Sequence, residues 1–246
     1  MLSVISKQAA TAKSLYRELG PLKVYLVDGK AVRHMPESAD FTDFALHCNF
    51  PNLIPQNELW IDQTDSESQR FFNLEHGVRE WREIHRGKST EESEKNALRY
   101  ERRLREQVQR IRYRPQDTDE TAPREVYVKR LGQFPEEVEV WAVDGEFVRA
   151  RYRTEFVLAG HGYVYHFIPN NEIWLDVTQG QDDWPATLLH EYVERTLMKY
   201  KGLSYNKAHD MATRAEFVLP DETPIDIVLR LSKDEALQMS VSTEVN

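Results

Sequence analysis

The chain has 246 residues, of which 40% are hydrophobic and 30% are charged, with a formal net charge of -9. This composition predicts a folded, soluble protein, and the negative charge disfavours non-specific binding to nucleic acid or anionic membranes. Cys48 is the single cysteine, so no intramolecular disulfide can form and a metal site would depend on other ligand types. No stretch approaches the ~20 apolar residues that span a bilayer. We expect a cytoplasmic protein without a membrane partner.

The first twenty residues predict an amphipathic helix. Apolar side chains recur there at helical spacing, at Val4, Ile5, Ala9, Ala12, Leu15 and Tyr16. Gly20 and Pro21 would end this helix, which we expect to serve in packing.

Two long stretches of the chain repeat each other. The segment 24–33, VYLVDGKAVR, matches 140–149, VWAVDGEFVR, and each is typical of a β-hairpin with an Asp-Gly turn. The segment 54–62, IPQNELWID, matches 168–176, IPNNEIWLD, and each is typical of a turn that leads into a strand. A match that keeps proline and tryptophan in register indicates a tandem duplication.

A pair of helices is predicted after each repeated strand. In both copies a run with helical periodicity is followed by a glycine, Gly87 or Gly202, and then by a second helix with Ser89 or Ser204 as N-cap. The expected fold is therefore α+β, with two units of a β-hairpin and strand followed by a helix-turn-helix pair, packed as a pseudo-symmetric pair. We expect five segments: an N-terminal helix 1–20, repeat 1 over 21–114, a linker 115–124, repeat 2 over 125–218, and a C-terminal strand and tail 219–246.

The second helix of repeat 1 is predicted to continue to Pro115 and is rich in arginine over residues 99–114. Such a helix can bind nucleic acid, but Glu101 and Glu106 interleave with the arginines and no aromatic stacking pattern accompanies them. A solvated helix face is the favoured interpretation, and nucleic-acid binding is the alternative.

Repeat 2 contains a cluster of histidines and glutamates between Thr187 and Glu216. On a helix, His190 and Glu194 stand four residues apart on one face, which is the spacing that two ligands of one metal require. His209 lies on the following helix, which can fold back toward the same point. The sequence therefore predicts a metal site formed by His190, Glu194 and His209.

The segment H190-E-Y-V-E194 resembles the H-E-x-x-H signature of zinc metallopeptidases, with Glu194 at the place of the second histidine. The resemblance implies zinc as cofactor and Glu191 as the general base that takes a proton from a water molecule acidified by the ion. The GHG, IPxNEIW and HExxER elements also resemble an uncharacterised prokaryotic or phage-type protein family that has no assigned activity.

Further residues are candidates for substrate contacts or additional ligands. His161 lies between two glycines, Arg195 and Tyr205 are candidates to stabilise an oxyanion, and Glu216 lies further along the helix of His209. In repeat 1, alignment on Gly87 and Gly202 places Glu75, His76, Arg79 and Glu94 at the positions of His190, Glu191, Glu194 and His209. No metal set is expected there, and only His47 is expected to have a counterpart, His161.

Two functions follow from these features. The first is a metal-dependent hydrolase that resembles a minimal zinc metallopeptidase and acts on a protein or peptide, or on another amide or ester. The second is a non-catalytic binding or regulatory module for a protein partner, in which the cluster is a structural network with His209 bonded to Glu191 or Glu194. Metal content distinguishes the two.

Overall fold

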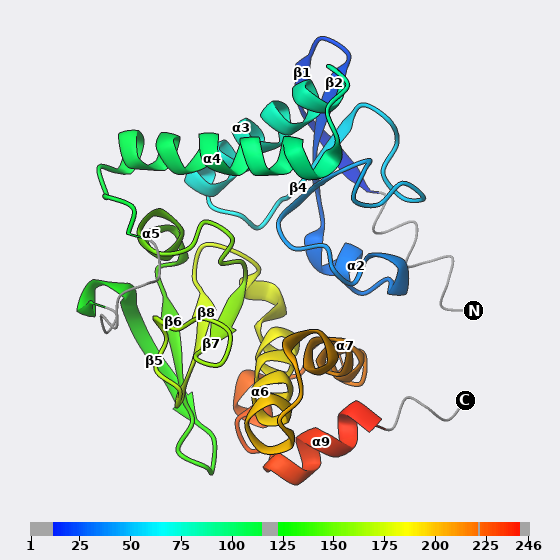
Figure 1. The fold of residues 1–246 in the computed structure, drawn as a ribbon. Helices are drawn as coiled ribbons and strands as arrows, with labels where there is room; N and C mark the ends of the chain where they lie inside the picture. The colour runs from blue at the N-terminus through cyan, green and yellow to red at the C-terminus, as the bar shows by residue number, and fades with distance from the viewer. Residues whose placement is uncertain (1–11, 115–122, 221, 242–246) are drawn as a thin grey trace. The chain divides into compact units, whose positions relative to one another are not determined.

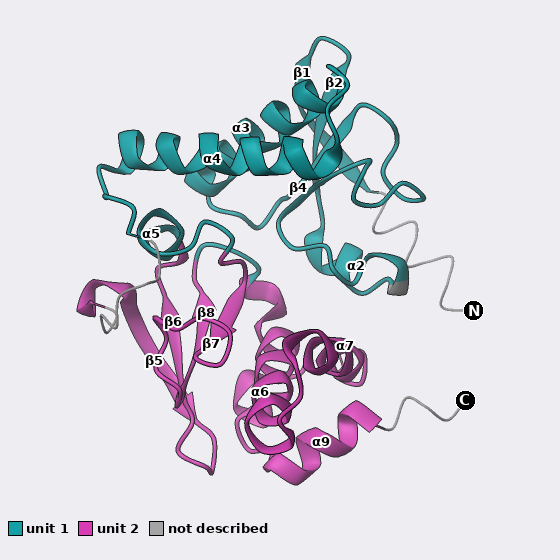
Figure 2. Ribbon diagram, viewed as in Figure 1, with its two compact units in different colours: residues 1–114, 146–155, 178–180 teal, residues 115–145, 156–177, 181–246 magenta. Residues whose placement is uncertain are grey.

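The computed structural model describes residues 12–114, 123–220 and 222–241 (Figure 1). The fold is α+β, as expected, with two four-stranded mixed sheets and helices associated with each. The chain forms two compact units (Figure 2). Unit 1 comprises residues 1–114, 146–155 and 178–180, and unit 2 comprises residues 115–145, 156–177 and 181–246.

The sheet of unit 1 has the order β1-β2-β4-β3. Its strands are β1 (Lys13–Leu19), β2 (Leu22–Val27), β3 (Phe44–Leu46) and β4 (Glu58–Asp62). Strands β1 and β2 form an antiparallel hairpin, β2 and β4 are parallel, and β3 is antiparallel to β4. The parallel pair requires a crossover, and the chain between β2 and β4 supplies it.

The sheet of unit 2 repeats this order as β5-β6-β8-β7, with the same directions of pairing. Its strands are β5 (Tyr127–Gln133), β6 (Glu139–Val143), β7 (Ala159–His161) and β8 (Glu172–Asp176). The repeated strings that end at Asp62 and Asp176 therefore form equivalent strands, β4 and β8, as predicted.

The predicted N-terminal helix is wrong over Lys13–Leu19, which is strand β1; residues 1–11 lie outside the described part of the chain. Five of the seven side chains of β1 are exposed, so there is no apolar helix face for the core to bury. Gly20, with φ +66°, makes the tight turn into β2, and pairing with β2 satisfies the backbone groups on the inner edge of β1.

The predicted Asp-Gly hairpins are also wrong, because each Asp-Gly pair begins a helix, α2 (Gly29–Arg33) or α5 (Gly145–Arg151). Asp28 caps α2 by accepting a hydrogen bond of 3.0 Å from the backbone N–H of Ala31. Aspartate and glycine favour both turns and helix starts, so the local sequence does not distinguish them. In unit 1, helix α2 places Arg33 in a buried ion pair with Asp62, at 3.0 Å, a contact between residues far apart in the sequence.

The predicted helix pairs are confirmed as α3 (Glu67–Ile84) with α4 (Thr90–Gln109), and α6 (Trp184–Lys201) with α7 (Tyr205–Glu216). Ser89 caps α4 by accepting from the N–H of Glu92, whereas Ser204 has the N-cap position of α7 without a side-chain cap bond. Strand β4 alternates between two cores: Leu59 and Ile61 belong to the cluster that includes residues of α3, and Trp60 to the cluster that includes Val32 of α2.

The predicted C-terminal strand is wrong, because the described residues form helices α8 (Ile225–Val228) and α9 (Lys233–Val241). Ser232 and Glu235 form a capping box at the start of α9, in which each side chain accepts from the other's backbone N–H, at 3.3 and 2.7 Å. The sequence contains this signal as Ser-Lys-Asp-Glu. Residues 242–246 of the predicted tail lie outside the described part.

Helix α4 ends earlier than predicted, at Gln109, because Arg110 has the left-handed conformation with φ +58°. Residues 115–122 of the predicted linker lie outside the described part, and the chain re-enters a short 3₁₀ turn, η2 (Arg124–Val126). Two similar turns are η1 (Pro36–Ser38) and η3 (Gln181–Asp183). Among the described helices, none is long and apolar enough to span a membrane.

Candidate metal centre

The predicted ligands lie on the helix pair of unit 2. Helix α6 is largely buried, because its Leu188, Leu189, Tyr192, Val193 and Leu197 belong to the core of unit 2. Helix α7 packs on α6 through small side chains, Ala208, Ala212 and Ala215. These alanines allow a close approach, so polar side chains of the two helices can meet.

His190, Glu194 and His209 do meet at one point, as the sequence predicted. The Nδ1 of His209 lies 3.0 Å from the Nε2 of His190 and 3.0 Å from the Oε2 of Glu194. The remaining separation, from His190 Nε2 to Glu194 Oε2, is 3.5 Å. Two ring nitrogens and one carboxylate oxygen therefore converge from three side chains.

Glu216 orients His190 from the end of α7. Its Oε1 forms a hydrogen bond with the Nδ1 of His190, so the Nδ1–H donates to the carboxylate. This bond leaves Nε2 to face Glu194 and His209. A carboxylate behind a histidine is the usual outer partner of a metal-ligating imidazole, because it fixes the ring and raises its basicity.

His161 and Glu191 complete the cluster on the other side of Glu194. His161 ends β7 and is fully buried, and its Nε2 lies 3.0 Å from the Oε1 of Glu194. Single ligand atoms of His161, Glu191 and Glu194 all lie within 4.8 Å of one another. The two oxygens of Glu194 thus face different histidines.

The cluster concentrates negative charge in a buried place. Burial opposes ionisation of Glu194, yet hydrogen bonds from His161, His190 and His209 hold its pKa well below the usual range. Burial and the neighbouring Glu194 raise the pKa of Glu191 to about 8. Burial disfavours the charged form of His190, but the carboxylates of Glu216, Glu194 and Glu191 raise its pKa well above the usual value.

No lysine or arginine forms an ion pair with Glu194 or Glu216 within the described part of the chain. The side chains of these two glutamates are only 3% and 20% exposed. Buried carboxylates require a compensating positive charge. Among the described residues, the histidines are the partners of these glutamates that can carry one, so the site favours either a proton or a metal cation.

Arg195 and Tyr205 lie beside the cluster in different ways. The guanidinium of Arg195 donates to the backbone carbonyl of Asn170, with Nε at 3.0 Å, and lies 5.5 Å from the ring centre of Tyr163. Its Nη1 is buried without a hydrogen-bond partner among the described residues. The ring of Tyr205 lies 5.4 Å from that of His209, and 46% of Tyr205 is exposed.

Unit 1 contains a partial copy of this cluster in a register that differs by one residue from the predicted one. His76 Nδ1 contacts Glu101 on α4 at 2.7 Å, and His76 Nε2 lies 3.9 Å from Glu80. These contacts repeat those of His190 with Glu216 and Glu194. His76, Glu80 and Glu101 are therefore the counterparts of His190, Glu194 and Glu216, and the predicted match of His76 to Glu191 is wrong.

The error in register arises because the spacing from histidine to glycine differs between the units. Gly87 follows His76 by 11 residues, whereas Gly202 follows His190 by 12. In the corrected register Gly77 replaces Glu191. Glu94 replaces His209, since the second helices keep the predicted register. Unit 1 thus lacks the third ligand and the predicted base.

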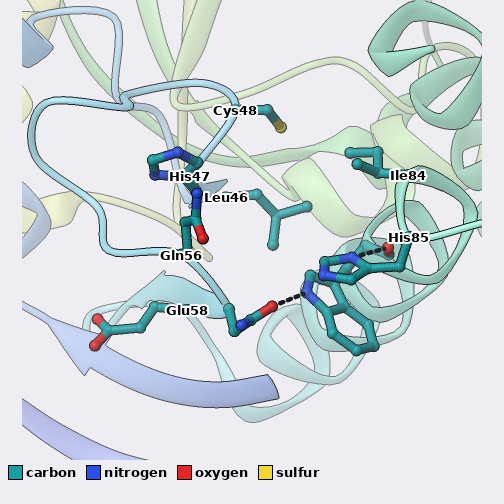
Figure 3. Close-up of a pocket in the computed structure, with 9 residues that line it drawn as sticks. Leu46, His47, Cys48, Gln56, Glu58, Ile84 and His85 are labelled. Carbon is teal, nitrogen blue, oxygen red and sulfur yellow. Dashed lines mark hydrogen bonds between the residues drawn. The ribbon is translucent and has the colours of Figure 1, made fainter. Parts of the chain in front are cut away.

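The predicted match of His47 to His161 is wrong as well. Leu46 pairs with Leu59 in the first sheet, as His161 pairs with the equivalent Ile173 in the second. Leu46 is therefore the counterpart of His161, while His47 contacts the carbonyl of Ile54 at 2.6 Å. Leu46, His47 and Cys48 line one side of a pocket of about 270 Å³, opposite Ile84 and His85 (Figure 3).

In unit 1 an internal cation balances the buried glutamate. The guanidinium of Arg105, which is 0% exposed, donates to Glu101 at 2.7 Å. Burial opposes ionisation of Glu101, but Arg105 and His76 lower its pKa to about 2. Arg102 of the same helix pairs with Glu155, while Arg99 and Arg103 are exposed. Arg105 therefore faces the core, away from the exposed Arg99 and Arg103.

Comparisons of the chain with protein-family models, with curated proteins and with solved structures gave no match.

The cluster of unit 2 fits a zinc ion. Nitrogen or oxygen ligands at ~2.0–2.1 Å from zinc in a tetrahedron lie about 3.4 Å apart. The three separations among His190, Glu194 and His209 are 3.0, 3.0 and 3.5 Å. The donor set of two imidazoles and one carboxylate is also one that zinc uses in catalytic sites. A hydrogen-bonded network without metal uses the same contacts.

Proposed function

We propose that the protein is a metal-dependent hydrolase whose zinc site is formed by His190, Glu194 and His209 in unit 2. The convergence of these three ligand atoms, with Glu216 behind His190, carries the proposal. The buried carboxylates supply the negative charge that a divalent cation neutralises, and no arginine or lysine pairs with Glu194 or Glu216 in the described residues.

A divalent ion held by these ligands would supply Lewis acidity, which polarises a carbonyl oxygen and acidifies a water molecule. Glu191 has the role of the proton acceptor, since its carboxylate lies beside Glu194 but, within the described part of the chain, forms no hydrogen bond with the three ligands. The same carboxyl group can return the proton to a leaving group. Tyr205 and the Nη1 of Arg195, which has no hydrogen-bond partner among the residues that the structure describes, are candidates for substrate contacts.

We infer that unit 1 is the scaffold half of a duplicated pair. The shared strand order supports a common origin of the two units. Unit 1 keeps the histidine and two glutamates of the cluster as His76, Glu80 and Glu101, but Arg105 neutralises Glu101. Glu94 stands at the position of the third ligand and Gly77 at the position of the base. Proteins or peptides are the proposed substrates, because the motif that suggests hydrolysis belongs to peptidases.

Metal content tests the site. The purified chain should contain one zinc ion, or take up one on titration of the metal-free protein, as measured by elemental analysis and calorimetry. Glu194→Gln should abolish binding, because it removes an anionic ligand that three histidines contact. Glu80→Gln is the matched control, since it changes the equivalent residue of unit 1, and it should keep one ion.

Hydrolysis tests the proposed role of Glu191. A panel of peptides, amides and esters should reveal a zinc-dependent turnover that Glu191→Gln removes while zinc binding persists. A chain that binds no zinc would overturn the metal site. Such a result would favour the second function, a binding or regulatory module in which the cluster is a structural network. Stoichiometric zinc without turnover of any substrate would instead contradict the hydrolase and keep the metal site.

A further inference from the structure

His161 is the fully buried member of the cluster, and the proposed function gives it no role. An imidazole beside a metal site can act in two ways. It can offer a lone pair to the ion as a ligand, or it can donate an N–H to a ligand and hold that ligand in place. The position of its proton distinguishes the two roles.

Two contacts determine that position. The backbone N–H of Tyr163 donates to the Nδ1 of His161 at 3.2 Å, so Nδ1 carries a lone pair and no proton. A neutral imidazole with a bare Nδ1 has its proton on Nε2. That Nε2 lies 3.0 Å from the Oε1 of Glu194, which accepts. The nitrogen that faces the cluster is therefore a donor and has no lone pair for a metal.

We propose that His161 is a positioning residue, which donates its Nε2–H to Oε1 of Glu194 and thereby presents Oε2 to the ion. This inference rests on the proposed metal site. It replaces the earlier expectation that His161 is an additional ligand.

The segment around His161 keeps the backbone donor in place. A Cβ added at Gly162 would lie 2.6 Å from the backbone oxygen of Ile168, and one at Gly160 would lie 2.5 Å from the ring of Tyr165. The carbonyl of His161 also accepts from the N–H groups of Val164 and Tyr165, both at 3.0 Å. The two glycines thus allow a tightly packed turn whose Tyr163 N–H reaches Nδ1.

Unit 1 shows what the same position contains where a third ligand is missing. Leu46 replaces His161, is 3% exposed, and offers Glu80 no hydrogen-bond donor. Leucine is therefore compatible with the fold at this place, which makes His161→Leu a suitable variant. Glutamine is the conservative variant, because its side-chain NH₂ can donate as Nε2–H does.

Nitrogen NMR of the histidine side chains tests the tautomer in the complete chain, before and after addition of zinc. We expect His161 to have a protonated Nε2 and a bare Nδ1 in both states. A protonated Nδ1, or a shift of Nε2 to that of a metal-bound nitrogen, would overturn the inference. The metal-free measurement decides the tautomer even if the chain binds no zinc, so failure of the proposed function remains a separate result.

Zinc titration of the variants tests the positioning role. His161→Leu should weaken zinc binding by about 10–100-fold, the range for loss of an outer-shell partner, and His161→Gln should recover most of that loss. The visible spectrum of the cobalt-substituted protein should keep its band positions in both variants, because the ligand set is unchanged. A changed spectrum, or equal loss in the two variants, would identify His161 as a ligand and refute the proposal.

Discussion

Glu216 offers a sharp test of the candidate centre, because it touches a ligand without being one. Its carboxylate bonds the Nδ1 of His190 from α7, and its side chain is 20% exposed. Glu216→Ala removes the acceptor that fixes the ring and its tautomer. Loss of such a partner typically weakens metal binding by ~10–100-fold, or about 1.4–2.8 kcal/mol.

The effect is measurable as thermal stabilisation by zinc. At a zinc concentration of ~100 times the dissociation constant, binding stabilises the wild-type chain by about 2.7 kcal/mol. A 10–100-fold weaker site at the same concentration leaves about 0.4–1.4 kcal/mol. For a chain of 246 residues, ~2–4 °C per kcal/mol predicts a zinc-induced rise in Tm of about 5–11 °C in the wild type and about 1–6 °C in Glu216→Ala.

Two controls separate this effect from a change of charge. Asp210→Ala removes a carboxylate from the exposed surface of the same helix and should keep the wild-type shift. Glu216→Gln keeps an oxygen acceptor and should lose less than Glu216→Ala. The reasoning is refuted if Glu216→Ala keeps the full zinc-induced shift, or if Asp210→Ala loses as much.

Three further predictions concern unit 1. Glu94→His should raise zinc binding from one ion to two by calorimetry, because His76 and Glu80 already have the geometry of two ligands; a stoichiometry that stays at one would contradict the proposed correspondence. Glu101→Ala should destabilise the chain by ~3–5 kcal/mol in urea at pH 7, because the buried charge of Arg105 loses its carboxylate partner. The pKa of Glu101 is lowered to about 2 in the folded chain, so its contribution to the free energy of unfolding is complete above its unfolded pKa of ~4.5 and is lost as the pH falls toward 2. The difference in stability between the variant and the wild type should therefore shrink over that range. Burial and Glu80 raise the pKa of Cys48 to about 11, so alkylation of Cys48 at pH 8 should be slower than that of free cysteine, and it should be faster in Glu80→Gln than in the wild type. A wild-type rate equal to that of free cysteine would contradict the raised pKa.

Local patterns in the sequence determined the repeated parts of the fold. The strands that end at Asp62 and Asp176 and the two helix pairs with their glycine turns follow from alternation, helical periodicity and capping residues. The meeting of His190 with Glu194 also follows from the sequence, because four residues make about one turn of a helix. These features depend on neighbours in the chain, which the sequence displays directly.

Contacts between distant residues decided the rest. Asp28-Gly29 begins a helix rather than a hairpin, where Arg33 reaches Asp62, and Lys13–Leu19 is a strand because β2 pairs with it. The spacing from histidine to glycine differs by one residue between the two helix pairs, so an alignment on the glycines misplaces the counterpart of His190. The contact of His76 with Glu101 identifies that counterpart. The proton of His161 likewise depends on where the Tyr163 N–H points, which is a property of the packed turn and not of the order of its residues.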